Sequence, residues 1–263
     1  MSGYVDIHAH VLPGIDDGPA EVDDALAMLQ AAAGCGIATI VCTPHLRSDF
    51  PDVNVHELAD RCTAMRGRMA SEAIDLELVC GAEVSLIWAI DAGEDELRLA
   101  SYAQRGTDLL IETPLTTIAG LDTLLYEVQL RGFRITLAHP ERSWEFQQDP
   151  SRVAELVRRG ILLQVNADTL LGDKRRSATS RLGARLCVDG LVHALASDSH
   201  RAESWRPVTR LPQAVEAAAA LVGPDRARWM AAAAPAAIVA GAGLPEAPPL
   251  LARRRKRRLW GAR

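Results

Sequence analysis

The 263-residue sequence predicts an α/β protein with a parallel, barrel-like closed sheet, and an open doubly wound sheet is the alternative. Short apolar runs typical of buried strands recur seven times, at residues 3–8, 37–43, 76–83, 108–113, 133–139, 161–167 and 191–198. Segments with helical spacing lie between them, at residues 20–36, 54–73, 117–132, 149–160 and 177–190. Because parallel neighbours need a crossover connection, strands that alternate with helices indicate a parallel sheet.

We expect a single domain over most of the chain. After residue 205 the sequence becomes Ala-rich, which predicts helices that pack on the rest of the domain, so we place the domain at residues 1–245. Residues 246–263 are Pro-rich and then basic, and we expect them to form a flexible C-terminal tail. The sequence contains no internal repeat that would suggest a solenoid.

Composition and charge exclude several classes of protein. The net charge is −5, but the last eleven residues carry seven Lys or Arg and no acid, so the other 252 residues hold 22 basic and 34 acidic side chains. The resulting net charge of −12 makes the body a poor binder of nucleic acid. No apolar run is long enough to span a membrane, and the N-terminus does not resemble a signal peptide. We therefore expect no transmembrane segment and a cytoplasmic location.

The cysteines predict reduced, mostly buried thiols, because they form an odd set without a C-x-x-C pair: Cys35, Cys42, Cys62, Cys80 and Cys187. The stretch from Cys62 to Arg68 fits the C-x₅-R spacing of thiol-dependent phosphatases. That chemistry needs a strand-to-helix loop whose amides hold phosphate and whose helix terminus lowers the thiol pKa. Cys62 lies inside a predicted helix instead, so we interpret it as a structural thiol.

Side chains of metal-binding type follow six of the seven predicted strands. They are His8, His10, Asp16 and Asp17 after the first strand, His45, Glu83, Glu112 and His139 after the next four, and Asp198 and His200 after the last. In a parallel α/β barrel the carboxyl ends of the strands meet at one rim, where active sites form. Imidazoles and carboxylates without thiolates suit Mn²⁺, Fe²⁺ or Zn²⁺. With one of the two adjacent aspartates counted, the nine candidates are enough for two or three ions.

Two histidines, His56 inside a predicted helix and His193 within a strand, are left out of this set. Arginines occur close to the candidate ligands. Arg142 follows His139 by three residues, and Arg201 and Arg206 follow the last ligand. Guanidinium groups beside a metal cluster suit a phosphate, while a salt bridge to a neighbouring carboxylate is the structural alternative for Arg142. The spacing does not decide between Arg201 and Arg206.

Six motifs occur in an order that resembles a known family. They are "DIHAHVLPGIDDGP", "ATIVCTPHLR", "GAEV", "LLIETP", "LAHPERS" and "ALASDSH". Over about residues 3–207 the sequence is similar to the polymerase-and-histidinol-phosphatase (PHP) superfamily, and within it to the manganese-dependent protein-tyrosine phosphatases of bacterial capsule and exopolysaccharide loci (CpsB/YwqE-like). The resemblance implies a distorted (β/α)₇ TIM-like barrel, the PHP fold, in a single domain.

The resemblance also implies a role for each motif residue. One metal ion would be held by His8, His10, Glu83 and Asp198, a second by Glu83, Glu112 and His139, and a third by Asp17, His45 and His200. Arg142 corresponds to a phosphate-contacting arginine of the family. A second such arginine precedes a proline, which favours Arg206, although its spacing here is one residue longer. Manganese is the implied metal, with iron or zinc as alternatives.

We therefore hypothesise that the protein hydrolyses phosphotyrosine in a protein, such as a tyrosine kinase that regulates capsule or exopolysaccharide synthesis. A hydroxide that bridges two metal ions would attack phosphorus. Arg142 and Arg206 would offset the charge of the transition state. Alternatives are a PHP phosphoesterase acting on histidinol phosphate or a nucleotide, and a regulator that binds phosphotyrosine without turnover. The oligomeric state stays open.

Overall fold

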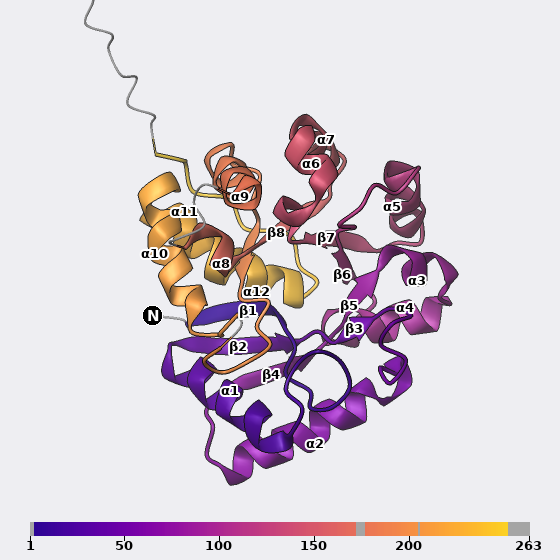
Figure 1. Cartoon of the computed structure of the whole chain (residues 1–263), viewed down its shortest axis with the longest axis vertical. Coiled ribbons are helices and arrows are strands. Elements are labelled where there is room, and N and C mark those ends of the chain that lie inside the picture. Colours follow the sequence, from indigo (N-terminus) through magenta and orange to yellow (C-terminus); the bar gives the residue numbers. More distant parts are fainter. Residues whose placement is uncertain (1–2, 172–176, 205, 252–263) are drawn as a thin grey trace, which may run out of the picture.

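The computed structural model describes residues 3–171, 177–204 and 206–251. The basic part of the predicted tail, from residue 252 on, lies outside the described residues. The fold is α/β: parallel strands occupy the interior and helices lie around them (Figure 1). Each of the seven predicted strands is present, which confirms the predicted class.

The strands form two parallel sheets. The first contains β1 (Tyr4–Ala9), β2 (Ile37–Cys42) and β4 (Glu77–Cys80), in that order. The second has the order β3-β5-β6-β7-β8-β9, with β3 at His45–Leu46, β5 at Glu83–Ser85, β6 at Asp108–Glu112, β7 at Arg134–Ala138, β8 at Leu162–Asn166 and β9 at Ala194–Ala196. The short strands β3 and β5 follow β2 and β4 along the chain and were not predicted as separate elements.

A closed sheet, the arrangement predicted from the sequence, does not occur in the described residues. The chain crosses from the first sheet to the second through residues 43–44 and 81–82. Pro44 has no N–H to donate to a ladder, so pairing stops there. Between β9 and β1 only one bridge forms, from Ala9 to Ser199, beside a hydrogen bond from the Asp198 N–H to the His8 carbonyl.

The five predicted helices are present with shorter bounds: α1 (Val22–Gly34), α2 (Leu58–Ser71), α5 (Leu121–Leu130), α7 (Ser151–Arg158) and α9 (Ala178–Val188). Short helices that the spacing did not predict are α3 (Leu86–Asp91), α4 (Glu94–Ala100), α6 (Trp144–Gln148) and α8 (Ala167–Leu170), with 3₁₀ turns at Val55–Glu57, Tyr102–Gln104 and Pro140–Arg142. The Ala-rich region forms α10 (Arg210–Val222), α11 (Pro224–Arg228), a π-helical turn (Trp229–Ala233) and α12 (Ala234–Val239).

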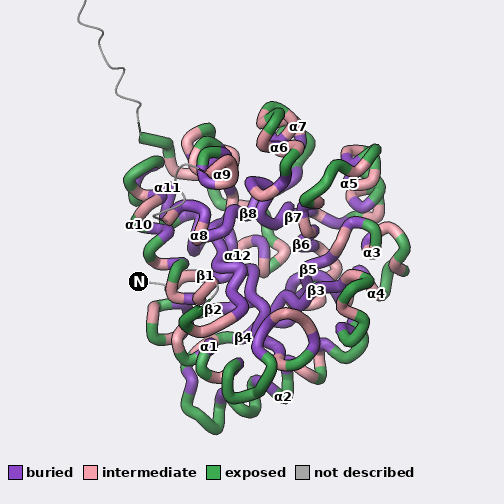
Figure 2. Tube along the Cα trace, viewed as in Figure 1, coloured by how far each residue is buried: buried purple, intermediate pink, exposed green. Residues whose placement is uncertain are grey.

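Buried strands and the inner faces of helices make up the core (Figure 2). Helix α1 buries Ala25, Met28, Leu29 and Ala32, the i, i+3, i+4, i+7 spacing of one helical face. Helix α10 of the Ala-rich region likewise buries Leu211 and Ala218, and α12 contacts β1. Among the described helices none has the length and hydropathy needed to cross a lipid bilayer.

His193, excluded as a ligand, has a structural role that makes stability depend on pH. The Leu163 N–H donates to its Nδ1 at 3.1 Å, and burial, with the charges of Arg226 and Arg134, lowers the pKa of His193 to about 4. Between its ordinary pKa near 6.5 and pH 4, the unfolded chain binds a proton that the folded chain does not. The free energy of unfolding therefore decreases by about 2 to 3 kcal/mol as the pH falls from 6.5 to 4.

Urea unfolding of the wild type and of His193→Gln at several pH values from 7 to 4 measures this loss. Glutamine can accept the same N–H but does not titrate. We expect the wild type to lose about 2 to 3 kcal/mol more stability than the variant over this range. Parallel stability curves would show that His193 titrates normally in the folded protein.

Candidate metal centre

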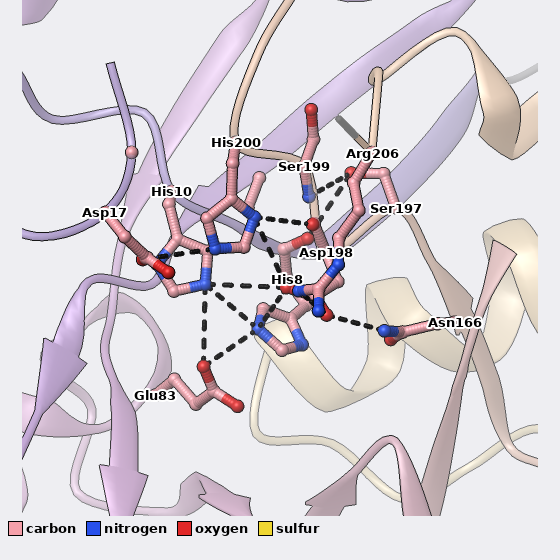
Figure 3. Close-up of polar contacts among 12 residues, drawn as sticks. His8, His10, Asp17, Glu83, Asn166, Ser197, Asp198, Ser199, His200 and Arg206 are labelled. Carbon is pink, nitrogen blue, oxygen red and sulfur yellow. Dashed lines mark hydrogen bonds and ion pairs between the residues drawn. The ribbon is translucent and has the colours of Figure 1, made fainter. Parts of the chain in front are cut away.

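The ends of six strands bring the predicted ligands to one place. His8 lies in β1, His45 and Glu83 begin β3 and β5, Glu112 ends β6, and His139 follows β7. Asp198 and His200 follow β9. The side chains of His8, His10, Glu83, Asp198 and His200 point toward one another (Figure 3). The strand-end pattern of the sequence thus corresponds to a single cluster in space.

All nine predicted ligands belong to groups whose donor atoms lie within 4.8 Å of one another. The groups are His10, Asp17, His45 and His200; His8, His10 and Asp198; His8, Glu83 and His139; and His45, Glu83 and Glu112. Four residues, His8, His10, His45 and Glu83, occur in two groups each, so the groups overlap into one centre. Such overlap is what a site for several cations with bridging ligands requires.

Glu83 lies in the middle of the centre and is almost fully buried. Its Oε2 lies 3.2 Å from His8 Nε2 and 3.0 Å from His45 Nδ1, and its Oε1 lies 2.8 Å from His139 Nε2. Burial alone would raise the pKa of Glu83, but the surrounding imidazoles, His8 and His45 foremost, hold it well below its ordinary value. The carboxylate therefore stays ionised in the folded protein.

The group formed by His10, Asp17, His45 and His200 reaches the surface through Asp17. Asp17 Oδ1 is 3.2 Å from His200 Nε2 and 3.7 Å from His45 Nε2, and the side chain of Asp17 is 37% exposed. Burial would raise the pKa of Asp17, but the neighbouring imidazole of His200 lowers it strongly. Burial lowers the pKa of His45 to about 4, which keeps its ring neutral and able to bind a cation.

The adjacent aspartates, left open by the sequence, have different contacts. Asp16 Oδ2 accepts from His10 Nδ1 at 2.8 Å and from the His45 N–H at 3.2 Å, and its Oδ1 accepts from the Gly18 N–H. Asp16 therefore orients His10 from behind, whereas Asp17 faces the other imidazoles. This arrangement favours Asp17 as the ligand, with Asp16 as a carboxylate that fixes the His10 ring, as is common around metal sites.

The arginines also separate into two roles. Arg206 Nη1 donates to Asp198 Oδ2 at 2.5 Å, and Arg142 Nη1 lies 3.6 Å from the same oxygen. Arg201 instead directs Nη1 to the backbone carbonyls of Asp17, Gly18 and His200. Only two of the three guanidinium groups thus reach the cluster of side chains, and Arg201 fastens the loop that carries Asp17.

Three residues of the centre have strained backbones. His139, Asp198 and Arg206 have φ of 38°, 50° and 51°, a region that costs a non-glycine residue about 1–3 kcal/mol. Such strain persists only where the surroundings enforce it, and it concentrates at functional sites. Its occurrence at three of the predicted site residues supports a functional centre at the ends of β7 and β9.

Several polar residues of the centre were not predicted. Arg47 Nη1 donates to both oxygens of Glu112, at 2.8 and 3.0 Å, and its guanidinium lies 5.1 Å from the ring of Phe50, which stacks on His45. Gln164 and Asn166 of β8 contact His8 and Asp198. Arg47 is the last residue of the "ATIVCTPHLR" motif, so the sequence contained a signal for it. Gln164 and Asn166 lie inside an apolar run and gave no such signal.

Cys62 has the structural role predicted for it. It is fully buried in α2, and its contact with the Cys42 thiol, together with burial, raises the pKa of its thiol. A nucleophilic thiol needs the opposite shift. All five cysteines are free, as predicted.

The donor set fits divalent cations. In the described residues, buried atoms without a hydrogen bond include Asp17 Oδ1, Glu83 Oε2, His45 Nδ1 and His139 Nδ1. Unpaired buried polar atoms are costly, and a cation would satisfy those that face the cluster. Imidazole nitrogens and carboxylate oxygens suit manganese, iron and zinc.

The fold and the site together define the class of protein: a parallel α/β scaffold that collects metal-binding side chains at the carboxyl ends of its strands. Residues 4–240 match the sequence model of the family "Capsular polysaccharide synthesis, CpsB/CapC". The chain therefore belongs to the CpsB/CapC family, which confirms the resemblance inferred from its motifs.

Relatives and solved structures agree with this family. The chain is 32% identical to tyrosine-protein phosphatase YwqE of Bacillus subtilis, over 76% of this chain and 78% of that protein. It is 29% identical to tyrosine-protein phosphatase CpsB of Streptococcus pneumoniae, over 85% of this chain and 93% of that protein. A crystal structure described for YwqE and CpsB as "unique metal-dependent tyrosine phosphatases" superposes with a TM-score of 0.78 at 27% identity, over 95% of this chain and 100% of that chain.

A more distant structure shares the fold alone. The inactive dihydroorotase-like domain of a Chaetomium thermophilum CAD-like multifunctional protein superposes with a TM-score of 0.60 at 13% identity, over 94% of this chain and 80% of that chain.

Proposed function

We propose that the protein is a manganese-dependent protein-tyrosine phosphatase, with two or three ions in the centre and with iron or zinc as alternative metals. The observation that carries the proposal is the overlap of nine metal-binding side chains in four groups with two guanidinium groups at the same carboxylate, Asp198. The names of the relatives, tyrosine-protein phosphatases, support phosphotyrosine as the substrate.

We assign the ligands as the family resemblance implies. The first ion would have His8, His10, Glu83 and Asp198; the second Glu83, Glu112 and His139; the third Asp17, His45 and His200. The distances support a sharing of His45 and His8 between neighbouring positions, because each occurs in two groups. Divalent ions in such a site lower the pKa of bound water and neutralise phosphoryl charge.

The chain's own residues would bind and orient the substrate. Arg142 and Arg206, both directed at Asp198, would bind the non-bridging phosphate oxygens with fork-like donors. Asp16 holds the His10 ring, and Arg201 holds the loop of Asp17, so neither needs to touch substrate. No protein nucleophile is required, which agrees with the buried Cys62.

The proposal extends to the fold, the partner and the location. The order of the strands in the two sheets and the Ala9–Ser199 bridge support a distorted (β/α)₇ barrel in one domain, residues 1–245. The family's link to capsular polysaccharide synthesis supports a tyrosine-phosphorylated regulator of that pathway, such as a kinase, as the partner. A cytoplasmic location follows from such a partner.

Release of phosphate from a phosphotyrosine peptide tests the function directly. We expect the Mn²⁺-loaded protein to be active, chelation and His139→Ala each to abolish activity, and Cys62→Ser to stay within about twofold of the wild type. Loss of activity with Cys62→Ser would contradict the metal route. Faster turnover of histidinol phosphate or a nucleotide would reassign the substrate, and tight peptide binding without phosphate release would indicate a regulator.

A further inference from the structure

Strand β8 carries no predicted ligand, yet its side chains connect two of them. Gln164 and Asn166 are buried, with 0% and 4% of their surface exposed. Gln164 Oε1 lies 2.9 Å from His8 Nδ1, Gln164 Nε2 donates to Asn166 Oδ1 at 2.8 Å, and Asn166 Nδ2 donates to Asp198 Oδ2 at 2.5 Å. We call Gln164 and Asn166 the amide relay. Figure 3 shows its Asp198 end.

The chemistry of the end groups fixes the direction of every bond in the relay. An ionised carboxylate only accepts, so Asn166 must present its NH₂ group to Asp198 and its Oδ1 to Gln164. Gln164 must then donate with Nε2, which leaves Oε1 facing His8. An amide oxygen only accepts, so His8 carries a proton on Nδ1, and Nε2 is the nitrogen left to bind a cation. That nitrogen faces Glu83 Oε2 at 3.2 Å, inside the cluster.

The backbone holds the relay in this place. The two side chains share one face of β8, as residues two apart in a strand do. Gln164 pairs with Ala194 and Asn166 with Ala196 of β9, the strand that leads to Asp198. The Asn166 N–H also donates to Glu141 Oε1 at 3.0 Å, and the Thr169 hydroxyl donates to the same oxygen at 2.9 Å. The end of β8 is therefore fixed relative to the "HPER" segment.

We propose that Gln164 and Asn166 are positioning residues of the metal centre, which hold His8 in the tautomer that can bind a cation and turn Asp198 toward the same cation. The inference rests on the proposed function. Partners that fix the tautomer and orientation of ligands typically change metal affinity by about 10- to 100-fold when removed. One relay here serves two ligands of the group formed by His8, His10 and Asp198.

Binding of Mn²⁺ to the full chain, measured by calorimetry after removal of bound metal, tests the relay without any assay of activity. We expect Gln164→Leu and Asn166→Leu to weaken binding of the tightest ion about 10- to 100-fold. Gln164→Glu still accepts from His8 Nδ1 and should recover part of that affinity. Thr136→Val is the matched control: Thr136 is equally buried, lies on neighbouring β7, and its hydroxyl has no hydrogen bond in the described residues.

Nitrogen chemical shifts of ¹⁵N-histidine in the metal-free wild type test the tautomer even if a variant fails to fold. We expect the His8 signals, identified by their loss in His8→Gln, to report a proton on Nδ1. An unprotonated Nδ1, or equal Mn²⁺ affinity in the wild type and the two Leu variants, would overturn the relay. A wild type that binds Mn²⁺ but releases no phosphate would contradict the proposed function and leave the relay standing.

Discussion

Glu83→Gln should reduce phosphatase activity by a factor on the order of 10³ or more and lower the number of bound ions. The substitution conserves shape and removes one negative charge from the centre. Glu83 contacts His8, His45 and His139 through its two oxygens and occurs in two of the four groups, so the loss affects more than one ion position. Removing a non-bridging ligand should affect fewer ions.

Two measurements on the same preparations check this expectation: kcat on a phosphotyrosine peptide at saturating Mn²⁺, and metal content by elemental analysis. Glu77→Gln is the matched control, because Glu77 is exposed on β4 and, among the described residues, its carboxylate accepts only from the Thr39 hydroxyl. We expect the control to keep both activity and metal content. Full metal content and near-normal kcat in Glu83→Gln would contradict a bridging role for Glu83.

Strand ends were the informative part of the sequence. An apolar strand that ends in His, Asp or Glu predicts a site residue. Burial accounts for the apolar residues of the strand but not for the polar residue at its end. The nine candidates chosen this way all lie in the cluster, while His56 is exposed near Glu96 and His193 bonds to the backbone of β8. The class of fold followed from the same strands.

Other features depend on distances that the sequence does not contain. Asp16 and Asp17 are equivalent by type and spacing, and only the path of the loop turns one behind His10 and the other toward His200. Gln164 and Asn166 alternate with apolar residues as any half-polar strand would. At Gly81, between β4 and β5, the backbone passes close to β2, because a Cβ on Gly81 would lie 3.1 Å from the Val41 side chain.

The largest effect outside the ligands should come from Arg206. Arg206→Met removes a donor aimed at the centre, and the loss of one such donor to a developing charge costs about 10²- to 10³-fold in kcat. Arg206 also donates to the ligand carboxylate of Asp198, so the variant is compared with the wild type at saturating Mn²⁺, where the ion positions are filled. We therefore expect a lower kcat and a higher inhibition constant for inorganic phosphate at saturating Mn²⁺.

Arg201→Met provides the contrast, because the two arginines were indistinguishable by spacing. Arg201 binds the backbone carbonyls of Asp17 and Gly18, so its loss should free the loop and weaken the ion assigned to Asp17, His45 and His200. Extra Mn²⁺ should then restore activity in Arg201→Met but not in Arg206→Met. The reverse pattern, rescue of Arg206→Met by metal and a phosphate-binding defect in Arg201→Met, would exchange the two roles, since a phosphate donor and a loop anchor respond oppositely to excess metal.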